Sequence, residues 1–340
     1  MSTPAPTTAL PALMLQAIER DLHLAIGLLE TEQYPAMVEM IAYHLGWLEA
    51  GGNAGGKRIR PLLTMLTCAA FGGEWRRALP VASGVELIHN FSLVHDDIQD
   101  GSRERRGRPT LWARWGVPQA LNTGDAMWAL ARLSLLRLQA EGFPGDIVLE
   151  IQRILDEACL HLTEGQHLDL AFESQAVVPL GDYMRMIEGK TAALVSAAAQ
   201  CGACIAGAAA DIRSACARFG RHLGLAFQIL DDILGIWGSA DRTGKPAGDD
   251  LRSHKKSLPV LHGLAHSEQF RALWSQDATD EQALLALTSA LEAAGSLEFA
   301  RSAAEDHTTL ALAALEEAGP SGEAGDELSH LARRLLQRDR

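Results

Sequence analysis

Hydrophobic residues recur along most of the chain at the three- and four-residue spacing of an α-helix, and the alternation typical of β-strands is missing. Glycine, proline and aspartate residues interrupt this pattern and mark where helices begin and end. The pattern therefore predicts an all-α protein. The expected helices are Leu10–Leu29, Ala36–Leu48, Lys57–Phe71, Glu74–Asp100, Gln119–Gln139, Asp146–Phe172, Asp182–Ala209, Asp211–Gly235, His254–His266, Asp280–Ala294, Leu297–Glu317 and Gly322–Gln337.

Three polar stretches lie between these helices and are expected to form loops. Gly51–Gly56 is rich in glycine, Gly101–Pro109 is strongly charged, and Ser239–Ser253 is rich in glycine and aspartate. The chain has no internal repeat at a fixed period and no linker long enough to divide it. We therefore expect a single domain over residues 1–340, with the proline-rich residues 1–9 as a disordered N-terminal segment.

The helix expected at Glu74–Asp100 changes from apolar to acidic at its C-terminal end. Asp96 and Asp100 are four residues apart and so lie on one face of the helix, with Asp97 beside them. Carboxylates at a helix C-terminus oppose the helix dipole by about 0.3–1 kcal/mol, so a solvated acidic helix end is one interpretation. The apolar turns that precede the acids weigh against that interpretation.

A second apolar helix ends in the same way, with the pair Asp231 and Asp232. Two acid clusters on separate apolar helices suit a hard divalent cation, which takes oxygen ligands and bridges readily to phosphates. The repetition therefore favours a Mg²⁺ site. It also suggests two helices that face one another and not a duplicated domain.

Basic residues accompany the acids in a chain that is otherwise acidic. Lys57 and Arg60 stand at the start of a helix, where free backbone N–H groups already attract anions. Four arginines follow the first acid cluster within six residues, and arginine binds phosphate oxygens in a bidentate manner. An acid cluster followed directly by arginines suits a binding site for a metal–diphosphate complex. The alternative interpretation is that these charges form salt bridges with one another at the surface. The four are Arg103, Arg105, Arg106 and Arg108.

Composition and charge narrow the class of protein further. Apolar residues make up 47% of the 340 residues, which indicates a globular protein, and the net charge of −13 argues against a nucleic-acid partner. Five scattered cysteines are typical of reduced thiols, so a cytoplasmic location is expected. The N-terminus lacks the basic and apolar regions of a signal peptide. Residues 191–210 are uncharged but mostly small, which predicts a buried helix and no stable membrane insertion.

These motifs, taken together and in this order, resemble the trans-isoprenyl diphosphate synthases, also called polyprenyl synthetases. The resemblance covers the chain from about Gly55 to Pro259. It implies the isoprenoid synthase fold, a single-domain helical bundle around a central active-site cavity, with three Mg²⁺ ions and a homodimer. The motifs are Gly56–Pro61, Asp96–Asp100, Arg105–Thr110, Glu164–Gln166, Gly189–Thr191, Phe227–Asp232 and Gly244–Pro246.

The reaction implied by this resemblance condenses isopentenyl diphosphate with an allylic diphosphate (dimethylallyl, geranyl or farnesyl) to a longer trans-prenyl diphosphate. Mg²⁺ is implied to assist ionisation of the allylic carbon–oxygen bond. The residues implied to bind the metal are Asp96, Asp97, Asp100, Asp231 and Asp232, with Asp96 and Asp100 on two Mg²⁺ ions and Asp231 on the third. The implied contacts of isopentenyl diphosphate are Lys57, Arg60, His89 and Arg106. Those of the allylic diphosphate are Arg105, Lys190, Lys245 and Lys255, and the groups implied to stabilise the carbocation are Thr191 and Gln228.

Product length is expected to depend on the residues one turn and slightly more before Asp96. Ser92 and Phe91 lie about 6 and 7.5 Å back along the helix axis. A small residue at the first position and an aromatic one at the second resemble the geranylgeranyl diphosphate synthases, which implies that Phe91 forms the floor for the growing chain. The alternatives are an ordinary core aromatic residue at this position and a farnesyl product.

The second acid motif departs from the family pattern, because Gly235 stands where a third aspartate is usual. We expect Asp249 or Asp250 in the following loop to compensate. A terpene cyclase of the same fold is an alternative function, but Ser257 replaces the glutamate that ends the cyclase metal motif. A non-catalytic regulatory subunit is another, although such a subunit would be expected to have lost acids or basic residues that this chain retains.

Overall fold

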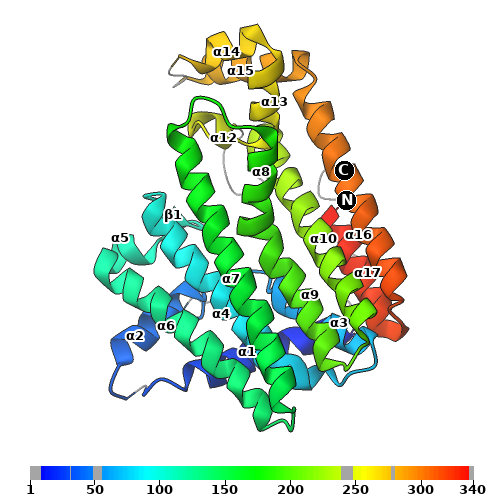
Figure 1. Cartoon of the computed structure of the whole chain (residues 1–340). Coiled ribbons are helices and arrows are strands. Elements are labelled where there is room, and N and C mark those ends of the chain that lie inside the picture. The colour runs from blue at the N-terminus through cyan, green and yellow to red at the C-terminus, as the bar shows by residue number, and fades with distance from the viewer. Residues whose placement is uncertain (1–8, 31, 49–55, 239–247, 277–279, 337–340) are drawn as a thin grey trace. The chain divides into compact units, whose positions relative to one another are not determined.

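The computed structural model describes residues 9–30, 32–48, 56–238, 248–276 and 280–336, and most of them are helical (Figure 1). They form two compact units. The first consists of Met1–Cys159, Ser196–Ala217 and Leu315–Ser329, and the second of Leu160–Val195, Arg218–Ala314 and His330–Arg340. The all-α prediction is confirmed, whereas a single domain over residues 1–340 stays a prediction. Residues 1–8, most of the segment predicted to be disordered, lie outside the described residues.

The first unit contains the helices of the N-terminal part of the chain. They are α1 (Ala9–Ile26), α2 (Pro35–His44), α3 (Ile59–Ala70), α4 (Leu79–Gln99), α5 (Leu111–Trp115), α6 (Val117–Leu136) and the first half of α7 (Gly145–Ser174). Short 3₁₀ turns at Trp75–Ala78 and Arg137–Gln139 precede α4 and follow α6. The helix expected from Glu74 therefore begins at Leu79, where Pro80 fits the first turn because no hydrogen-bond donor is needed there.

The predicted loop Gly101–Pro109 contains a small β-hairpin. Strand β1 (Glu104–Arg105) pairs antiparallel with β2 (Arg108–Pro109). The two connecting residues have positive φ angles, 54° at Arg106 and 72° at Gly107, which is the geometry of the tightest hairpin turn. Strands of two residues are too short to produce an alternating pattern, so the sequence predicted only a loop.

Within the first unit, α4 lies against α6 (Figure 1). Glycines allow this close approach in two places. A Cβ on Gly84 of α4 would lie 3.3 Å from the carbonyl oxygen of Ala131, and a Cβ on Gly124 of α6 would overlap the imidazole of His95. The two helices therefore run in opposite directions, which places the acidic end of α4 beside the first half of α6.

The second unit begins within α7. It continues through α8 (Leu180–Ile187), the π-helical segment η4 (Glu188–Ala192), the start of α9 (Ala193–Ile205) and most of α10 (Ala210–Trp237). It also contains α12 (Asp249–Arg252), α13 (Leu258–His266), α14 (Glu268–Trp274), α15 (Glu281–Ala293) and most of α16 (Ser296–Ala318), and α17 (Gly322–Leu336) is divided between the units.

Four details of the second unit differ from the prediction. The helix expected at Asp182–Ala209 is interrupted by η4, and α14 was not expected. The helix expected from His254 begins only at Leu258, because Pro259 fits best in a first turn. Of the loop expected at Ser239–Ser253, residues 239–247 lie outside the described residues, and Asp249–Arg252 forms α12.

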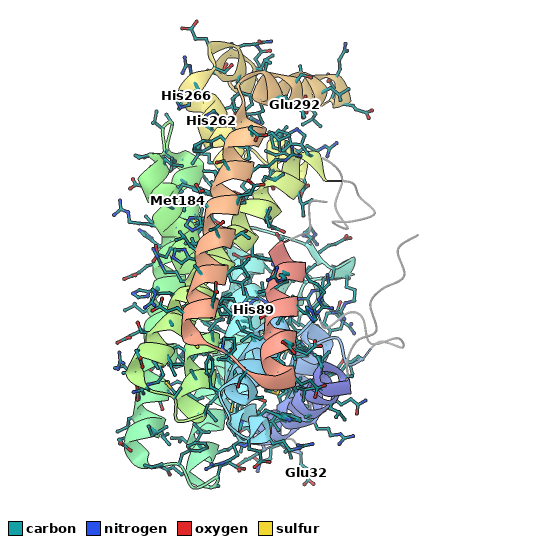
Figure 2. The ribbon with its side chains drawn as sticks, turned by 90° about the vertical axis from the view of Figure 1, so that its right-hand side faces the viewer. Glu32, His89, Met184, His262, His266 and Glu292 are labelled. Carbon is teal, nitrogen blue, oxygen red and sulfur yellow. The ribbon has the colours of Figure 1, made fainter. Side chains whose placement is uncertain are left out.

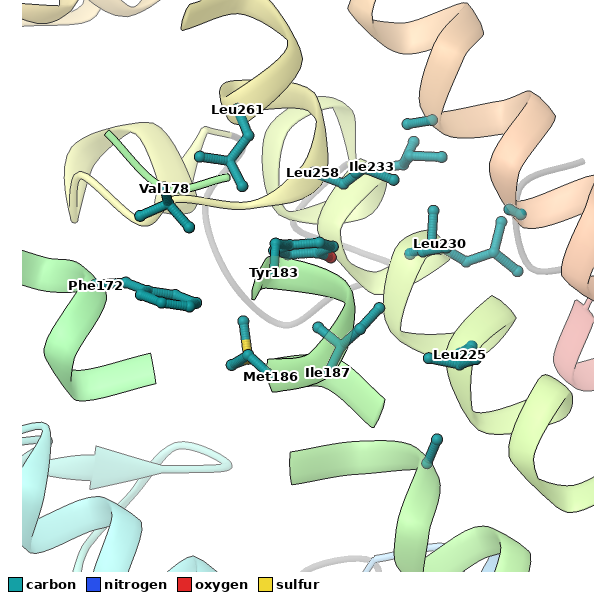
Figure 3. Packing of buried hydrophobic residues seen from close by; sticks show 14 residues of the cluster. Phe172, Val178, Tyr183, Met186, Ile187, Leu225, Leu230, Ile233, Leu258 and Leu261 are labelled. Carbon is teal, nitrogen blue, oxygen red and sulfur yellow. The ribbon is translucent and has the colours of Figure 1, made fainter. Parts of the chain in front are cut away.

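Apolar side chains from α7, α8, α10, α13 and α16 form a buried cluster in the second unit (Figure 3). Tyr183 of α8 lies within it, close to Met186 and Leu258, and directs its hydroxyl toward α10. Burial of one large apolar side chain contributes about 1.5–3 kcal/mol. The cluster therefore fixes the positions of these helices relative to one another, including the acidic segment of α10.

In the uncharged stretch at residues 191–210, the expected buried helix is confirmed as far as Ile205, the end of α9, where Ala198 and Cys201 are fully buried; residues 206–209 are not helical. Within the described ranges, no single helix has the length and apolar composition needed to cross a membrane. The helices α15 and α16 meet that test only as a pair, and they are bent by 62° at the break between them.

Candidate active site

The first acid motif occupies the last turn of α4, in the first unit. The Asp96 side chain is 18% exposed, and Asp100 is exposed on the same face. Asp97 lies about 100° further around the helix and points into the protein, with its side chain 3% exposed. Burial raises the pKa of Asp97 to about 6, although Arg105 opposes this shift.

Arg105 joins the two neighbouring aspartates. Its Nε donates a hydrogen bond of 2.8 Å to Asp97, and its Nη2 lies 3.4 Å from Asp96. The buried carboxylate of Asp97 thus holds the Arg105 guanidinium in place beside the more exposed carboxylate of Asp96. A bidentate fork fixed in this way is suited to bind a phosphate group next to a metal ion.

The β-hairpin that carries Arg105 is held against α2. Arg108 donates a hydrogen bond of 3.1 Å from Nη1 to the carbonyl oxygen of Tyr43, and its guanidinium lies 4.8 Å from the centre of the Tyr43 ring. The Tyr43 hydroxyl donates in turn to the carbonyl oxygen of Pro109 at 2.8 Å. Arg108 is therefore a structural residue, whereas Arg106 at the turn is exposed.

His44, the last residue of α2, is buried beside these arginines. Burial, and then the positive charges of Arg105, Arg106 and Arg108, lower the pKa of His44 to about 3. Its imidazole is therefore neutral at pH 7. The same residues line a pocket in the first unit, so the positive charge there is concentrated on the arginines.

The start of α3 supplies a second group of cations. Gly56 has a φ of 90°, a conformation that favours glycine, and the guanidinium of Arg106 lies against it, 2.8 Å from where a Cβ would stand. Arg58 is buried and pairs with the buried Glu86 at 2.8 Å, which anchors the chain at this point. Lys57, by contrast, is exposed.

Arg60, the second residue of α3, approaches His89 of α4 (labelled in Figure 2). Its Nη1 lies 3.3 Å from Nε2 of His89, and its Nε is buried with no hydrogen-bond partner in the described ranges. Burial, and then the charge of Arg60, lower the pKa of His89 well below its usual range, so the neutral ring accepts from Arg60. A buried guanidinium with an unused donor is suited to receive an anion.

In the second unit, glycines bring α7 and α10 against the π-helical segment η4. A Cβ on Gly165 of α7 would overlap the backbone nitrogen of Lys190, and a Cβ on Gly224 of α10 would lie 2.6 Å from Cα of Ala192. A Cβ on Gly189 would overlap the carbonyl oxygen of His161. Single π-helical turns within helices are frequent at functional sites, and this one is held by contacts that only glycine permits.

The π-helical segment carries Lys190 and Thr191. Lys190 forms an ion pair of 2.5 Å with Asp169 of α7, and the Thr191 hydroxyl donates to Oε1 of Gln228 at 2.7 Å. Sequence reasoning missed Asp169. Its position four residues after Gly165, on the same face of α7, was the available signal.

The second acid motif, on α10, also contains one exposed and one buried aspartate. Asp231 is exposed, whereas the Asp232 side chain is only 1% exposed. The Asp232 carboxylate accepts hydrogen bonds from the hydroxyl of Tyr183, the backbone nitrogen of Leu258 at 3.0 Å and Nε2 of Gln228 at 3.1 Å. Asp232 is thus part of a buried network.

Lys255 lies at the edge of this network, with Nζ 3.6 Å from Asp232 and 3.9 Å from Asp250. Burial alone would lower the pKa of Lys255, but the two carboxylates outweigh it and the pKa is raised. A Cβ on Gly235 would lie 2.5 Å from Oδ2 of Asp250. Gly235 therefore makes room for the Asp250 carboxylate, and compensation for the missing third aspartate stays a prediction for Asp249 and Asp250.

The carboxylates of the acid motifs are suited to bind Mg²⁺ that is also bound to a diphosphate substrate. Across the described segments, no three His, Cys, Asp or Glu side chains are close enough together to hold a metal by themselves. Asp96 and Asp100 present carboxylate oxygens on one helix face of the first unit, and Asp231 presents a carboxylate in the second unit. Mg²⁺ is commonly held by one or two carboxylates together with substrate phosphates and water, so the carboxylates of each motif, taken by themselves, fit it.

The remaining predicted residues are placed as follows. The ring of Phe91 contacts that of His95 edge-on, with centroids 4.9 Å apart, and the hydroxyl of Ser92 donates to the carbonyl oxygen of His89 at 2.8 Å. Lys245 lies outside the described residues. The expectation that the two acid motifs face one another stays a prediction.

Exposed carboxylates on α4 and α10, with arginine or lysine side chains in each motif, suit an all-α enzyme that binds a metal–diphosphate complex. The sequence profile of the family described as Polyprenyl synthetase matches residues 46–291. The chain belongs to this polyprenyl synthetase family and is therefore a trans-prenyltransferase.

Two similar proteins come from Mycobacterium tuberculosis. The first is "(2E,6E)-farnesyl diphosphate synthase", 42% identical over 317 residues, which cover 89% of this chain and 87% of that one. The second is "Geranylgeranyl diphosphate synthase", 40% identical over 309 residues, 87% of this chain and 85% of that one. The family is therefore clear, but identity alone does not separate the two product lengths.

Solved structures share the fold over nearly the whole chain. The geranylgeranyl pyrophosphate synthetase of Pyrococcus horikoshii is 31% identical, has a TM-score of 0.88 and covers 97% of this chain and 98% of that one. The geranylgeranyl pyrophosphate synthase of Corynebacterium glutamicum, complexed with isoprenyl diphosphate and magnesium, is 25% identical, has a TM-score of 0.82 and covers 96% and 98%. These likenesses confirm the isoprenoid synthase fold.

Proposed function

We propose that this chain condenses isopentenyl diphosphate with an allylic diphosphate and releases a longer trans-prenyl diphosphate. The observation that carries this proposal is the presence of a cation in each acid motif: Arg105 beside Asp96 on α4, and Lys255 3.6 Å from Asp232, the neighbour of the exposed Asp231, on α10. Such an arrangement suits a reaction in which a diphosphate leaves and its developing charge must be stabilised.

We assign the two substrates to different cations. The unused donor of the buried Arg60, beside the neutral His89, supports binding of isopentenyl diphosphate, with Lys57 and Arg106 completing that set. The allylic diphosphate is assigned to Arg105, Lys190, Lys245 and Lys255. Lys190 exchanges its pair with Asp169 for this ligand.

The allylic carbon–oxygen bond breaks first, and the electron pair leaves with the diphosphate. Bound Mg²⁺, held by Asp96, Asp100 and Asp231, would supply charge neutralisation of this leaving group. The oxygens of Thr191 and Gln228 present negative dipoles to the carbocation. The double bond of isopentenyl diphosphate then forms the new carbon–carbon bond, and the released diphosphate takes the proton that is lost.

We propose geranylgeranyl diphosphate as the product, with Phe91 as the floor and the small Ser92 beside it. Farnesyl diphosphate is the alternative, which the similarity to the mycobacterial farnesyl diphosphate synthase favours. Incubation of the purified protein with Mg²⁺, isopentenyl diphosphate and each allylic starter, followed by sizing of the products, decides between them. Turnover without isopentenyl diphosphate would indicate a terpene cyclase, and no turnover a regulatory subunit.

We further propose three Mg²⁺ ions per active site, two on Asp96 and Asp100 and one on Asp231. Titration of the protein with Mg²⁺ at saturating inorganic pyrophosphate counts them. We also propose a cytoplasmic location, which the five free cysteines support.

A homodimer is the proposed assembly. Four of the exposed apolar residues of α6 follow one another after four, seven and eight residues, which places these four on one helix face: Val117, Leu121, Trp128 and Leu136. We assign this face to a second copy of the chain. Trp128→Asp should yield a monomer in sedimentation velocity, whereas Leu285→Asp, an exposed apolar residue on α15, should leave the mass unchanged.

A further inference from the structure

Asp232 stands next to a proposed metal ligand but has a different environment. Successive residues of an α-helix point about 100° apart, so Asp231 and Asp232 cannot face the same way. Asp231 is exposed, and the Asp232 side chain is 1% exposed. The acid pair therefore contains one carboxylate that reaches solvent and one that is enclosed by protein.

The enclosed carboxylate already has donors from several parts of the chain. Its Oδ2 accepts from the hydroxyl of Tyr183 on α8 and from the backbone nitrogen of Leu258 at the start of α13. Its Oδ1 accepts from Gln228 and lies 3.6 Å from Nζ of Lys255. An ionised carboxylate offers about four acceptor positions; three hydrogen bonds occupy three of them, and the ammonium group of Lys255 is the charged group beside the fourth. A metal ion at Asp232 would have to displace buried donors, each of which would then lack a partner.

One of these contacts determines which way the amide of Gln228 points. A carboxylate only accepts, so the group of Gln228 that faces Asp232 at 3.1 Å must be the NH₂ group. The opposite end, Oε1, therefore faces Thr191, whose hydroxyl donates to it at 2.7 Å. A threonine hydroxyl can donate or accept, so Thr191 alone would tolerate either orientation. Asp232 is the group that excludes the flipped amide.

This orientation matters for the chemistry. With the oxygen toward Thr191, the residue presents the negative end of its dipole where a carbocation is to be stabilised, and a flipped amide would present N–H groups instead. The same carboxylate also holds the ammonium group of Lys255, which Asp250 approaches at 3.9 Å. We propose that Asp232 is a positioning residue that fixes the amide of Gln228 and the place of Lys255, and is not a Mg²⁺ ligand. This inference rests on the proposed function, because it assumes that a carbocation forms beside Thr191.

The two adjacent aspartates allow a matched test with the same substitution. In Asp232→Asn, the new NH₂ group faces Gln228 and forces its amide to flip. We expect kcat to fall by about 30-fold or more, while the Mg²⁺ concentration for half-maximal activity changes by less than about 2-fold. In Asp231→Asn, we expect that Mg²⁺ concentration to rise by about 10-fold or more.

A binding measurement separates the two roles without turnover. The melting temperature with Mg²⁺ and saturating inorganic pyrophosphate should rise in Asp232→Asn as in the unchanged protein, and this rise should be smaller in Asp231→Asn. A Mg²⁺ requirement that increases equally in both variants would overturn the proposal, as would an unchanged kcat in Asp232→Asn. If the unchanged protein makes no prenyl product but still shows the rise, the proposed function fails and the binding result still assigns the ligand.

A double variant tests orientation directly. Combining Asp232→Asn with Gln228→Glu exchanges the donor and the acceptor of the hydrogen bond and keeps the net charge. The carboxylate introduced at position 228 again places an oxygen toward Thr191, so kcat should recover by about 10-fold over Asp232→Asn alone. No recovery in a double variant that melts cooperatively would contradict the role of amide orientation. Tyr183→Phe removes another donor to Asp232 without touching Gln228, and it should leave kcat within about 3-fold.

Discussion

Each acid motif contains one buried carboxylate and one more exposed carboxylate, but the partners of the buried carboxylate differ between the two motifs. In the first unit, the inward carboxylate of Asp97 pairs with Arg105 alone among the described side chains. In the second unit, Asp232 gathers Tyr183, Gln228 and Lys255. The carboxylate of Asp97 thus holds one side chain on the hairpin, whereas loss of the Asp232 carboxylate would disturb several groups at once. Two adjacent aspartates in one motif therefore differ in exposure and in the side chains that they contact.

The largest effect is expected from substitution of the more exposed aspartate of the first motif, Asp96. Asp96→Asn removes a proposed Mg²⁺ ligand, so we expect kcat/KM to fall by about 10²–10³-fold, or about 3–4 kcal/mol in the transition state. Asp97→Asn leaves Asp96 in contact with Arg105, so the expected loss is about 10-fold. Steady-state kinetics over a range of Mg²⁺ concentrations measures both. Equal losses in the two variants would show that the inward and outward positions do not differ in role.

The second prediction concerns the backbone contacts that hold η4 in the second unit. Gly189→Ala places a methyl group on the carbonyl oxygen of His161, and neither backbone can yield easily. We expect a loss of about 2–3 kcal/mol in the free energy of unfolding, measured with urea, and weaker binding of the allylic diphosphate. Gly181→Ala on α8 is the matched control, because no atom lies within 4 Å of its added methyl group. A Gly189→Ala variant as stable as this control would contradict the close packing.

The sequence was sufficient to predict the helices and the chemical groups, because both depend on local spacing. It also carried an unused signal for the inward aspartates. Leu87, Val94 and Asp97 share one face of α4, and each is buried. On α10, Ile229 and Asp232 share a buried face in the same way. The spacing of the apolar residues therefore indicates that the second aspartate of each pair, Asp97 or Asp232, lies on the buried face of its helix.

Other features could not be predicted, because they depend on contacts between distant segments. The π-helical turn at Lys190 is held by Gly165 and Gly224, which are separated in the chain. The hairpin places Arg106 at a positive φ that the sequence gives no reason to expect. The role of Gly235 depends on Asp250, whose carboxylate occupies the space that a side chain at position 235 would need.

The third prediction uses the arginine-rich side of the first unit, where His44 is buried. Its pKa of about 3 in the folded protein lies below the ordinary value of 6.5, so protons bind preferentially to the unfolded chain. The stability contributed by neutral His44 is present above pH 6.5 and is lost as the pH falls toward 3. At pH 5 the loss is about 2 kcal/mol relative to pH 7.5, and His44→Gln should remove that part of the pH dependence. Urea unfolding at both pH values checks this, and an identical pH dependence in the variant would refute it.

The smallest effect on rate, and the most specific one, is expected at Phe91. The corresponding position before Asp231 is Ala226, followed by Phe227, so the two motifs carry their aromatic residue one position apart. If Phe91 forms the floor for the growing chain, Phe91→Ala opens space below it, and the main product should lengthen by one or more isoprene units. The rate should stay within about 3-fold, because the group removed does not touch the reacting atoms. Phe227→Ala is the control, and it should leave the product length unchanged whatever its effect on rate. Product sizing by chromatography measures both variants, and a Phe91→Ala product of unchanged length would make Phe91 an ordinary packing residue beside His95.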